Sequence, residues 1–171
     1  LIEAALGLLI KKPSAQAACL HALAKALEAS HARCGDTGEG HPEFYLRKKL
    51  YDAIGASRGD ASTTAYLFTL LQKPIDELRN GVYHMLVATV VALPHFSALA
   101  LFQADTLRTF WFERTTEFTK EGREWKFALL QSLQECPAFS DLRPQDMRAV
   151  SKYVKEGPFF SEPRFAEPLT M

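Results

Sequence analysis

Apolar residues recur at steps of three and four positions along almost the whole chain, and no sustained two-residue alternation occurs. This spacing is typical of amphipathic α-helices and not of half-buried strands. The pattern therefore predicts an all-α protein. Its helices are expected to begin at or beside Ser14, Pro42, Thr63, Pro74, Phe96, Asp105, Glu121 and Pro144.

The clearest apolar stripe belongs to the helix expected after Pro74, where Asp76 and Glu77 place negative charge in the first turn, as the helix dipole favours. Gly81 within it costs about 1 kcal/mol relative to alanine, which indicates close packing at that point. Ser14 is expected as the N-cap of an earlier helix. The expected buried stripes are Leu20, Leu23, Ala24 and Leu27; Leu46, Leu50 and Ile54; and Ile75, Leu78, Val82, Leu86 and Val90.

The arrangement of the helices favours a repeat fold. Four of them start or stop at a proline, and short linkers join them. Such spacing is typical of armadillo and HEAT solenoids, whose repeats run about 40 residues, although a compact helical bundle would give the same periodicity. We expect one helical-repeat domain of the armadillo/HEAT type over residues 1–155 and an extended C-terminal tail over residues 156–171. Residues 35–41 form a glycine-rich polar loop.

Composition excludes several classes of function. Lys plus Arg and Asp plus Glu both number 20, whereas nucleic-acid and membrane-surface proteins rely on a strong basic field. No apolar run approaches the roughly 20 residues of a membrane-spanning helix. The widely spaced Cys19, Cys34 and Cys136 indicate reduced intracellular thiols. Because the pattern is helical from Leu1 and no Met precedes it, we expect a fragment of a longer protein.

The glycine-rich loop and its flanks hold the one candidate metal site, made of His31, Cys34, Asp36, Glu39 and His41. A zinc site needs four fixed ligands, often in tight pairs such as Cys-x-x-Cys. A solvated linker is the better interpretation, because a single Cys lies here in a polar stretch. No nucleophile has a base held beside it by a third group. We therefore expect no enzyme, no metal and no cofactor.

Arg47, Lys48 and Lys49 form the only basic run. Consecutive residues spread around a helix instead of forming one stripe, so a solvated surface is expected there. Trp111 and Trp125, with neighbouring phenylalanines, are expected to pack in the core rather than to line a binding cleft.

Three blocks in the second half of the sequence carry a family resemblance. They are residues 73–79 (Lys-Pro-Ile-Asp-Glu-Leu-Arg), residues 107–117 (Leu-Arg-Thr-Phe-Trp-Phe-Glu-Arg-Thr-Thr-Glu) continued by 121–127 (Glu-Gly-Arg-Glu-Trp-Lys-Phe), and residues 152–160 (Lys-Tyr-Val-Lys-Glu-Gly-Pro-Phe-Phe). Their order and spacing resemble those of the 26S proteasome non-ATPase regulatory subunit 5 family. Members of that family are chaperones of proteasome base assembly. The resemblance covers residues 73–163.

The resemblance implies a helical-repeat chaperone for assembly of the base of the 26S proteasome regulatory particle. Its expected partner is the C-terminal domain of one regulatory ATPase subunit, held without a cofactor and without catalysis. We expect a protein that is monomeric by itself and located in the cytoplasm and also in the nucleus. The alternative is a helical-repeat scaffold or adaptor of an unrelated protein complex.

Contact residues for such a partner are expected at polar positions on the side of the Pro74 helix opposite its core stripe, in the segment after Phe112, and in the aromatic pair after the last helix. For each of them the alternative is solvated surface, or, for the two phenylalanines, packing on the last helix. The expected contact residues are Arg79, Asn80, His84, Arg114, Glu117, Arg123, Phe159 and Phe160.

Overall fold

The computed structural model describes residues 6–9, 11–57, 59 and 62–161, and every regular element among them is a helix. The prediction of an all-α protein is therefore confirmed. The elements are α2 (Pro13–Cys34), α3 (Pro42–Ala56), α4 (Thr63–Leu71), α5 (Asp76–Ala92), α6 (Pro94–Leu101), α7 (Asp105–Phe112), η1 (Arg114–Thr116), α8 (Lys120–Glu135), η2 (Pro137–Asp141) and α9 (Pro144–Glu156).

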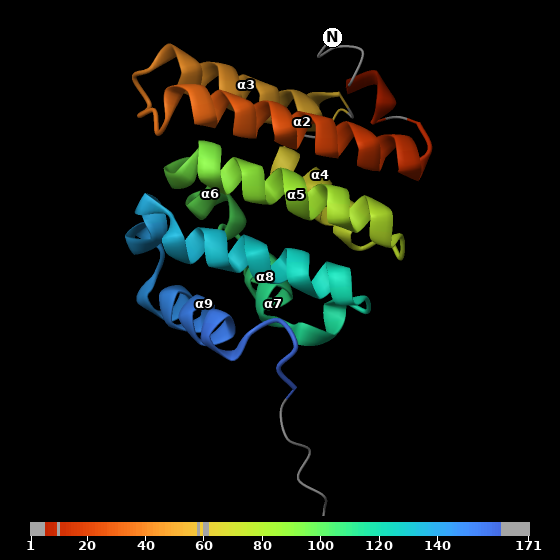
Figure 1. Ribbon diagram of the computed structural model, residues 1–171, viewed down its shortest axis with the longest axis vertical. Coiled ribbons are helices and arrows are strands. Elements are labelled where there is room, and N and C mark those ends of the chain that lie inside the picture. The colour runs from red at the N-terminus through yellow and green to blue at the C-terminus, as the bar shows by residue number, and fades with distance from the viewer. Residues whose placement is uncertain (1–5, 10, 58, 60–61, 162–171) are drawn as a thin grey trace, which may run out of the picture.

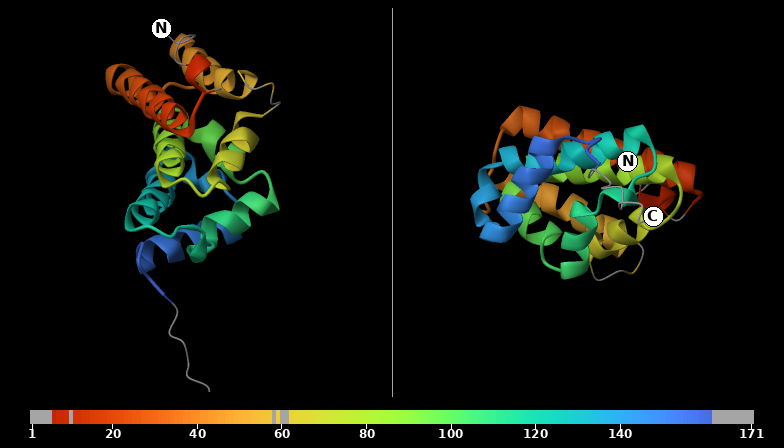
Figure 2. Two further views of the ribbon diagram at one scale, coloured as in Figure 1. Left: turned by 90° about the vertical axis from the view of Figure 1, so that its right-hand side faces the viewer. Right: turned by 90° about the horizontal axis from the view of Figure 1, so that it is seen from below.

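The helices form two layers along the long axis of the molecule. The three longest helices, α2, α5 and α8, lie side by side, with α5 packed between the other two (Figure 1). Helices α3, α4, α6 and α7 lie behind them, and α9 packs beside α8 at the C-terminal end (Figure 2). Because α5 has neighbours on both sides, it is the central helix of the fold.

Burial along α5 follows from this position. The predicted stripe residues Leu78, Val82, Leu86 and Val90 are all buried, and so is most of the rest of the helix. Gly81 faces α2 so closely that a Cβ there would lie 3.1 Å from the carbonyl oxygen of Ala17. The close packing predicted at Gly81 is confirmed.

Two helix ends differ by one or two residues from the prediction. Helix α2 begins at Pro13, with Lys12 as its N-cap and no side-chain cap, because proline's fixed φ suits the first helical position. Helix α9 continues through Glu156, so the chain leaves helical structure at Gly157. The predictions made for the start of the chain and for the tail beyond Ser161 lie outside the described residues.

Helix α3 buries only part of the predicted stripe: Ile54 is buried and Leu50 packs against the core, as expected, but Leu46 is not buried. Leu46 is 61% exposed, whereas Arg47 is only 2% exposed. The inward face is built on Arg47, Tyr51 and Ile54, which are spaced four and three residues apart. The expectation that Arg47 lies in a solvated basic run is therefore wrong, although Lys49 is exposed as expected.

The guanidinium of Arg47 connects three parts of the chain. Its Nη1 donates to the carbonyl oxygens of Gly35 and Ala92, each at 3.1 Å, and its Nη2 donates to the carbonyl oxygen of Ser30 at 3.0 Å. Its Nε donates to Ser30 Oγ at 2.7 Å. These carbonyls end α2 and α5, where the helix dipole favours a positive charge. Arg47 therefore fixes the ends of two helices against α3.

Replacing Arg47 with methionine should lower the free energy of unfolding by about 3 kcal/mol, because it leaves several buried carbonyl groups without a donor. The matched control is Lys49→Met, which removes an exposed charge on the same helix and should change stability by less than about 0.5 kcal/mol. Urea denaturation of both variants checks this. Equal stabilities for the two variants would contradict it.

Candidate partner-binding groove

A groove of about 850 Å³ lies at the C-terminal end of the molecule, and we call it the C-terminal groove. It is bounded by the end of α7, the η1 turn, the first turns of α8, the last turns of α9 and residues 158–161. Aromatic side chains supply much of its lining, and they are Phe112, Phe118, Tyr153, Phe159 and Phe160.

Five of the eight predicted contact residues line this groove. Arg114 and Glu117 come from η1 and the turn after it, and Arg123 comes from α8. Phe159 and Phe160 arrive from beyond α9. The structure thus brings together residues that are up to 46 positions apart in the sequence, whereas the other three predicted residues lie elsewhere.

Arg114 holds the end of α9 in place. Its Nη1 donates to the carbonyl oxygen of Gly157 at 2.7 Å, and its Nη2 lies 2.9 Å from Glu156 Oε2. The guanidinium also lies over two aromatic rings, 3.9 Å from the ring centre of Tyr153 and 5.1 Å from that of Phe160. Such cation–π contacts orient the rings as well as the charge. Phe160 is therefore docked, while Phe159 remains 51% exposed.

Arg79 and Glu117 form a buried ion pair. Arg79 Nε donates to Glu117 Oε2 at 3.1 Å and Nη2 donates to Oε1 at 2.5 Å, a two-pronged geometry that suits the planar guanidinium. Nη2 also donates to the carbonyl oxygen of Thr116 at 2.6 Å, and the Tyr83 hydroxyl donates to Glu117 Oε1. Arg79 is 6% exposed and Glu117 only 3%.

Lys126 completes this group from α8. Its Nζ donates to the carbonyl oxygens of Phe110 and Glu113, each at 2.6 Å, and to Thr116 Oγ1 at 2.8 Å. We call Arg79, Tyr83, Glu117 and Lys126 the buried ionic cluster. Two helices, α5 and α8, thereby hold the turn that carries one wall of the C-terminal groove.

The expectation that Arg79, Asn80 and Glu117 are exposed to solvent is wrong, because all three side chains are buried. Asn80 is 6% exposed, like Arg79. The physical reason is the position of α5 between α2 and α8, since the side opposite its first apolar stripe is itself covered. The spacing of residues along one helix does not reveal how many neighbours that helix has.

His84 lies away from the groove in a small cluster between α2, α5 and α8. Its Nδ1 is 2.8 Å from Nδ1 of His21, its Nε2 is 2.9 Å from Glu28 Oε1, and its ring centre is 5.1 Å from that of Trp125. Burial lowers the pKa of His21, and His84 and Lys25 lower it further. His84 therefore has several neighbours within the chain, and its role as a partner contact stays a prediction.

The two tryptophans differ in their surroundings. Trp111 is 1% exposed and its Nε1 donates to the carbonyl oxygen of Leu101 at 2.8 Å, which confirms its predicted place in the core. Trp125 is half-buried against His84.

The charges that remain available in the C-terminal groove are of both signs. Glu113 is exposed, its carboxylate accepts hydrogen bonds from the backbone amide and hydroxyl of Thr115, and it makes no ion pair with any described residue. Arg123 uses its Nε to bond the carbonyl oxygen of Glu117 and makes no ion pair with any residue that the structure describes. Lys152 is 70% exposed, and its Nζ lies 3.8 Å from Glu156, which Arg114 already holds. Phe118, 80% exposed, lies in the same groove. This arrangement suits a segment that carries apolar side chains together with charged ones.

Phe118 and Lys152 were not among the predicted contact residues. A signal for Phe118 is present in the sequence, because it is a lone aromatic residue within the polar run from Arg114 to Lys120. Lys152 carries no such signal, since many surface helices contain lysines at similar positions.

The described residues do not form the candidate metal site at the glycine-rich loop. Within residues 6–9, 11–57, 59 and 62–161, no group of three or more His, Cys, Asp or Glu side chains could hold a metal ion. His31 Nδ1 lies 3.8 Å from Asp36 Oδ1. Over the same residues, no helix is both long and apolar enough to cross a membrane.

The stability contributed by Lys126 should depend on pH. Burial lowers its pKa from about 10.5 to about 7, although Glu117 and Glu113 act in the opposite direction. Between these two values the unfolded chain binds one proton more than the folded chain, so the free energy of unfolding rises with pH. The wild type should gain roughly 1 kcal/mol per pH unit over Lys126→Met between pH 7 and 10.

Chemical denaturation of both proteins across that pH range measures this difference. The difference should be smallest below pH 7, where the lysine is protonated in both states. Identical pH profiles for the wild type and Lys126→Met would contradict the prediction.

Comparison with known proteins extends over nearly the whole chain. A family model described as proteasome non-ATPase 26S subunit matches residues 19–168. Comparison with curated proteins and with solved structures gives no match. The family match includes most of α2, every later helix and all residues of the C-terminal groove. On this evidence the chain belongs to the family of proteasome non-ATPase 26S subunits.

Proposed function

We propose that the chain is a chaperone for assembly of the base of the 26S proteasome regulatory particle. In this proposal it binds the C-terminal domain of one regulatory ATPase subunit and does so without catalysis. The observation that carries the proposal is the family match over residues 19–168, which includes all three sequence blocks that resemble the assembly chaperones. Its proposed place of action is the cytoplasm, and also the nucleus.

The C-terminal groove supports a role in protein binding. It offers two exposed phenylalanines, Phe118 and Phe159, beside the positive charges of Arg123 and Lys152. Aromatic and arginine side chains are the residue types that most often dominate binding energy at protein interfaces. The buried ionic cluster holds this wall in place before a partner arrives, which reduces the entropy lost on binding.

We further propose that the helices are repeats of the armadillo or HEAT type. Helices α2, α5 and α8 occupy equivalent places in one layer, and each is followed by shorter helices that lie behind it or at its end (Figures 1 and 2). Stacked repeats of this kind bury a continuous core, and each contacts only its neighbours. A longer protein could continue the same stack.

The test is a pull-down of the chain with the isolated C-terminal domain of each regulatory ATPase subunit. We expect selective retention of one domain. Phe118→Ser and Lys152→Glu should each weaken that binding about tenfold, a loss of about 1.4 kcal/mol, because they alter the groove without touching the buried ionic cluster. Variants of Arg79 or Arg114 are unsuitable, because both side chains hold the fold together.

Matched controls separate the groove from the general surface. Leu46→Ser removes an apolar side chain that is 61% exposed and lies outside the groove. Lys155→Glu reverses an exposed charge that is on the same helix as Lys152 but also lies outside the groove. Both should bind as the wild type does. Retention of no domain, or equal retention of all of them, by a chain shown to be folded would refute the proposed function.

A further inference from the structure

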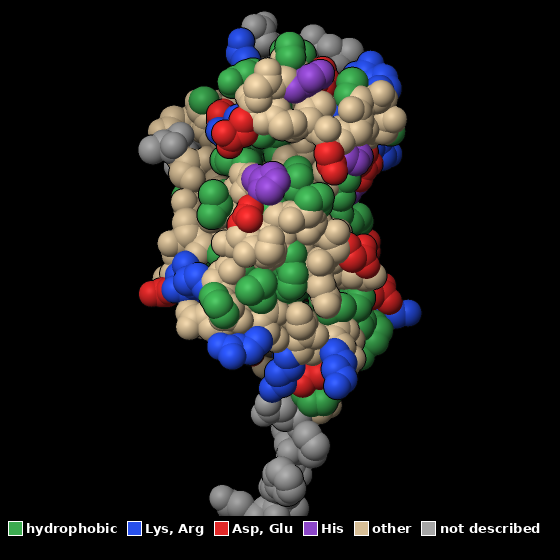
Figure 3. All heavy atoms as spheres, turned by 90° about the vertical axis from the view of Figure 1, so that its left-hand side faces the viewer, with side chains coloured by type: hydrophobic (Ala, Val, Ile, Leu, Met, Phe, Trp, Pro, Cys, Tyr) green, Lys and Arg blue, Asp and Glu red, His purple; other side chains and the backbone are tan. Residues whose placement is uncertain are grey.

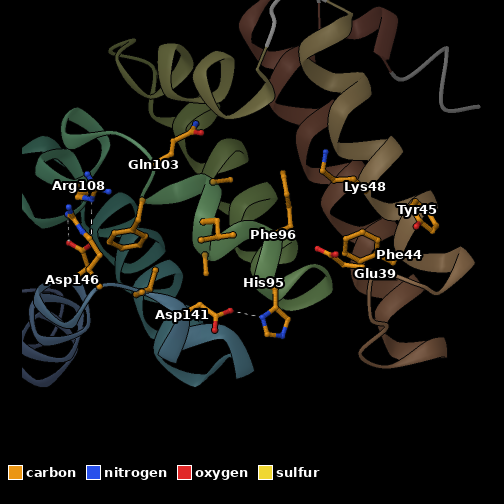
Figure 4. A pocket seen from close by; sticks show the side chains of 16 residues that line it. Glu39, Phe44, Tyr45, Lys48, His95, Phe96, Gln103, Arg108, Asp141 and Asp146 are labelled. Carbon is orange, nitrogen blue, oxygen red and sulfur yellow. Dashed lines mark hydrogen bonds and ion pairs between the residues drawn. The ribbon is translucent and has the colours of Figure 1, made fainter.

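A second hollow, of about 740 Å³, opens on a different face of the molecule, and we call it the lateral groove. One wall is the first half of α3 with Glu39 before it, the floor is α6, and the other wall comes from α7, η2 and the start of α9 (Figure 4). Figure 3 looks onto this face, where a histidine with an acidic side chain directly below it lies near the middle, and Lys and Arg side chains gather toward one end.

Apolar side chains line the lateral groove without being covered. Leu99 is 63% exposed and Tyr45 is 61% exposed, although both stand beside the half-buried rings of Phe44 and Phe96. Lys48 Nζ lies 4.4 Å from the ring centre of Phe96, so Leu99 and Tyr45 are the apolar side chains that the groove leaves most exposed. Removal of such surface from water stabilises a complex by about 25 cal/mol per Å² of apolar area. The groove therefore has the apolar component of a binding site.

The positive charges around the lateral groove are already neutralised within the chain. Lys48 Nζ lies 2.6 Å from both carboxylate oxygens of Asp52. Arg143 and Arg108 share the carboxylate of Asp146, with Oδ2 2.8 Å from Arg143 Nε and 3.5 Å from Arg108 Nε. Arg108 also pairs through Nη1 with Asp105 Oδ1 at 2.5 Å. Asp146 is itself only 4% exposed. These cations therefore offer little attraction to an acidic ligand.

The carboxylates at the mouth of the groove have no such permanent partners. Glu39 is exposed and makes no ion pair with any described residue. Asp141, 40% exposed on the opposite wall, pairs with His95 at 2.6 Å, and a histidine carries a charge only when protonated. Figure 4 shows His95 between these two acidic side chains. Negative charge is therefore left at the mouth of an apolar groove, beside aromatic rings.

We propose that the lateral groove binds a basic, apolar segment of a partner protein. A leucine or phenylalanine side chain of that segment packs on the exposed Leu99. A neighbouring arginine or lysine pairs with Glu39, close to the aromatic wall formed by Phe44 and Tyr45, and Asp141 adds negative charge from the other side of His95. This inference does not depend on the proposed chaperone function.

The probe is a fluorescein-labelled octapeptide, Gly-Ser-Leu-Arg-Phe-Arg-Ser-Gly, titrated with the folded chain and followed by fluorescence anisotropy. Two matched peptides replace both arginines with glutamate, or the leucine and phenylalanine with serine. We expect the first peptide to bind at least about tenfold more tightly than either of the others, because both the charge and the apolar contact are needed. Amide chemical shifts from nuclear magnetic resonance locate the bound peptide.

Variants of the chain test the two components separately. The double variant Glu39→Gln/Asp141→Asn keeps the shape of both side chains and the hydrogen bond to His95, and should weaken binding about tenfold. Leu99→Ser should weaken it by about the same factor. Glu124→Gln and Leu46→Ser are the controls, since each changes an exposed residue of the same type outside the groove. The controls should bind like the wild type.

Three results would overturn the proposal. They are equal or tighter binding of the glutamate peptide, chemical shift changes confined to residues outside the lateral groove, and unchanged affinity in both the double variant and Leu99→Ser. Shift changes centred on Phe118 and Phe159 would assign the peptide to the C-terminal groove instead. Because the altered side chains are exposed, circular dichroism should show all variants folded, and a loss of binding then reports on the groove itself.

Discussion

The ion pair between Arg79 and Glu117 joins the central helix to the turn that precedes α8. Both side chains are almost fully buried, and the guanidinium also bonds the carbonyl oxygen of Thr116. Loss of one partner from such a pair costs about 3–5 kcal/mol, because it leaves the other charge buried and unpaired. Lys126 bonds the carbonyl oxygens of Phe110 and Glu113, which precede the same turn, and Thr116 Oγ1 within it. The backbone between α7 and α8 therefore has little freedom.

The position of the C-terminal groove follows from that turn. Arg114 starts the turn and reaches the end of α9, where it bonds Gly157 and lies over Tyr153 and Phe160. Phe118 ends the turn and remains exposed. The buried Arg79–Glu117 pair thus fixes the turn from which Arg114 reaches the last helix. The lateral groove depends on other contacts, those of α3 and α6, and carries Glu39 and Asp141 at its mouth.

Much of the fold could be predicted from the sequence, because apolar spacing and proline positions are local signals. The helix boundaries and the close approach at Gly81 are examples. Arg47 and Arg79 were misjudged for one common reason. Charged residues are mostly exposed, and nothing in the residues nearby shows that a distant carbonyl or carboxylate will meet them.

The candidate site was predictable only in part. The family resemblance drew attention to Arg114, Arg123, Phe159 and Phe160, which the structure gathers around one groove. Local pattern alone gives no reason to connect residues beyond α9 with a turn before α8. The sequence does not predict the lateral groove, because its walls come from α3 and η2, which are about a hundred residues apart. Hydrophobic periodicity reports only on neighbours within one helix, so it does not show that these two elements meet.

The most direct test of this account is amide hydrogen exchange of Arg79→Lys, which keeps the charge but loses the two-pronged geometry of the guanidinium. If the buried ionic cluster holds the groove, exchange should accelerate first in residues 113–119 and 157–161, while α2 keeps the protection of the wild type. Uniform acceleration throughout the chain, or no change in the turn, would contradict the claim that this interaction positions the C-terminal groove.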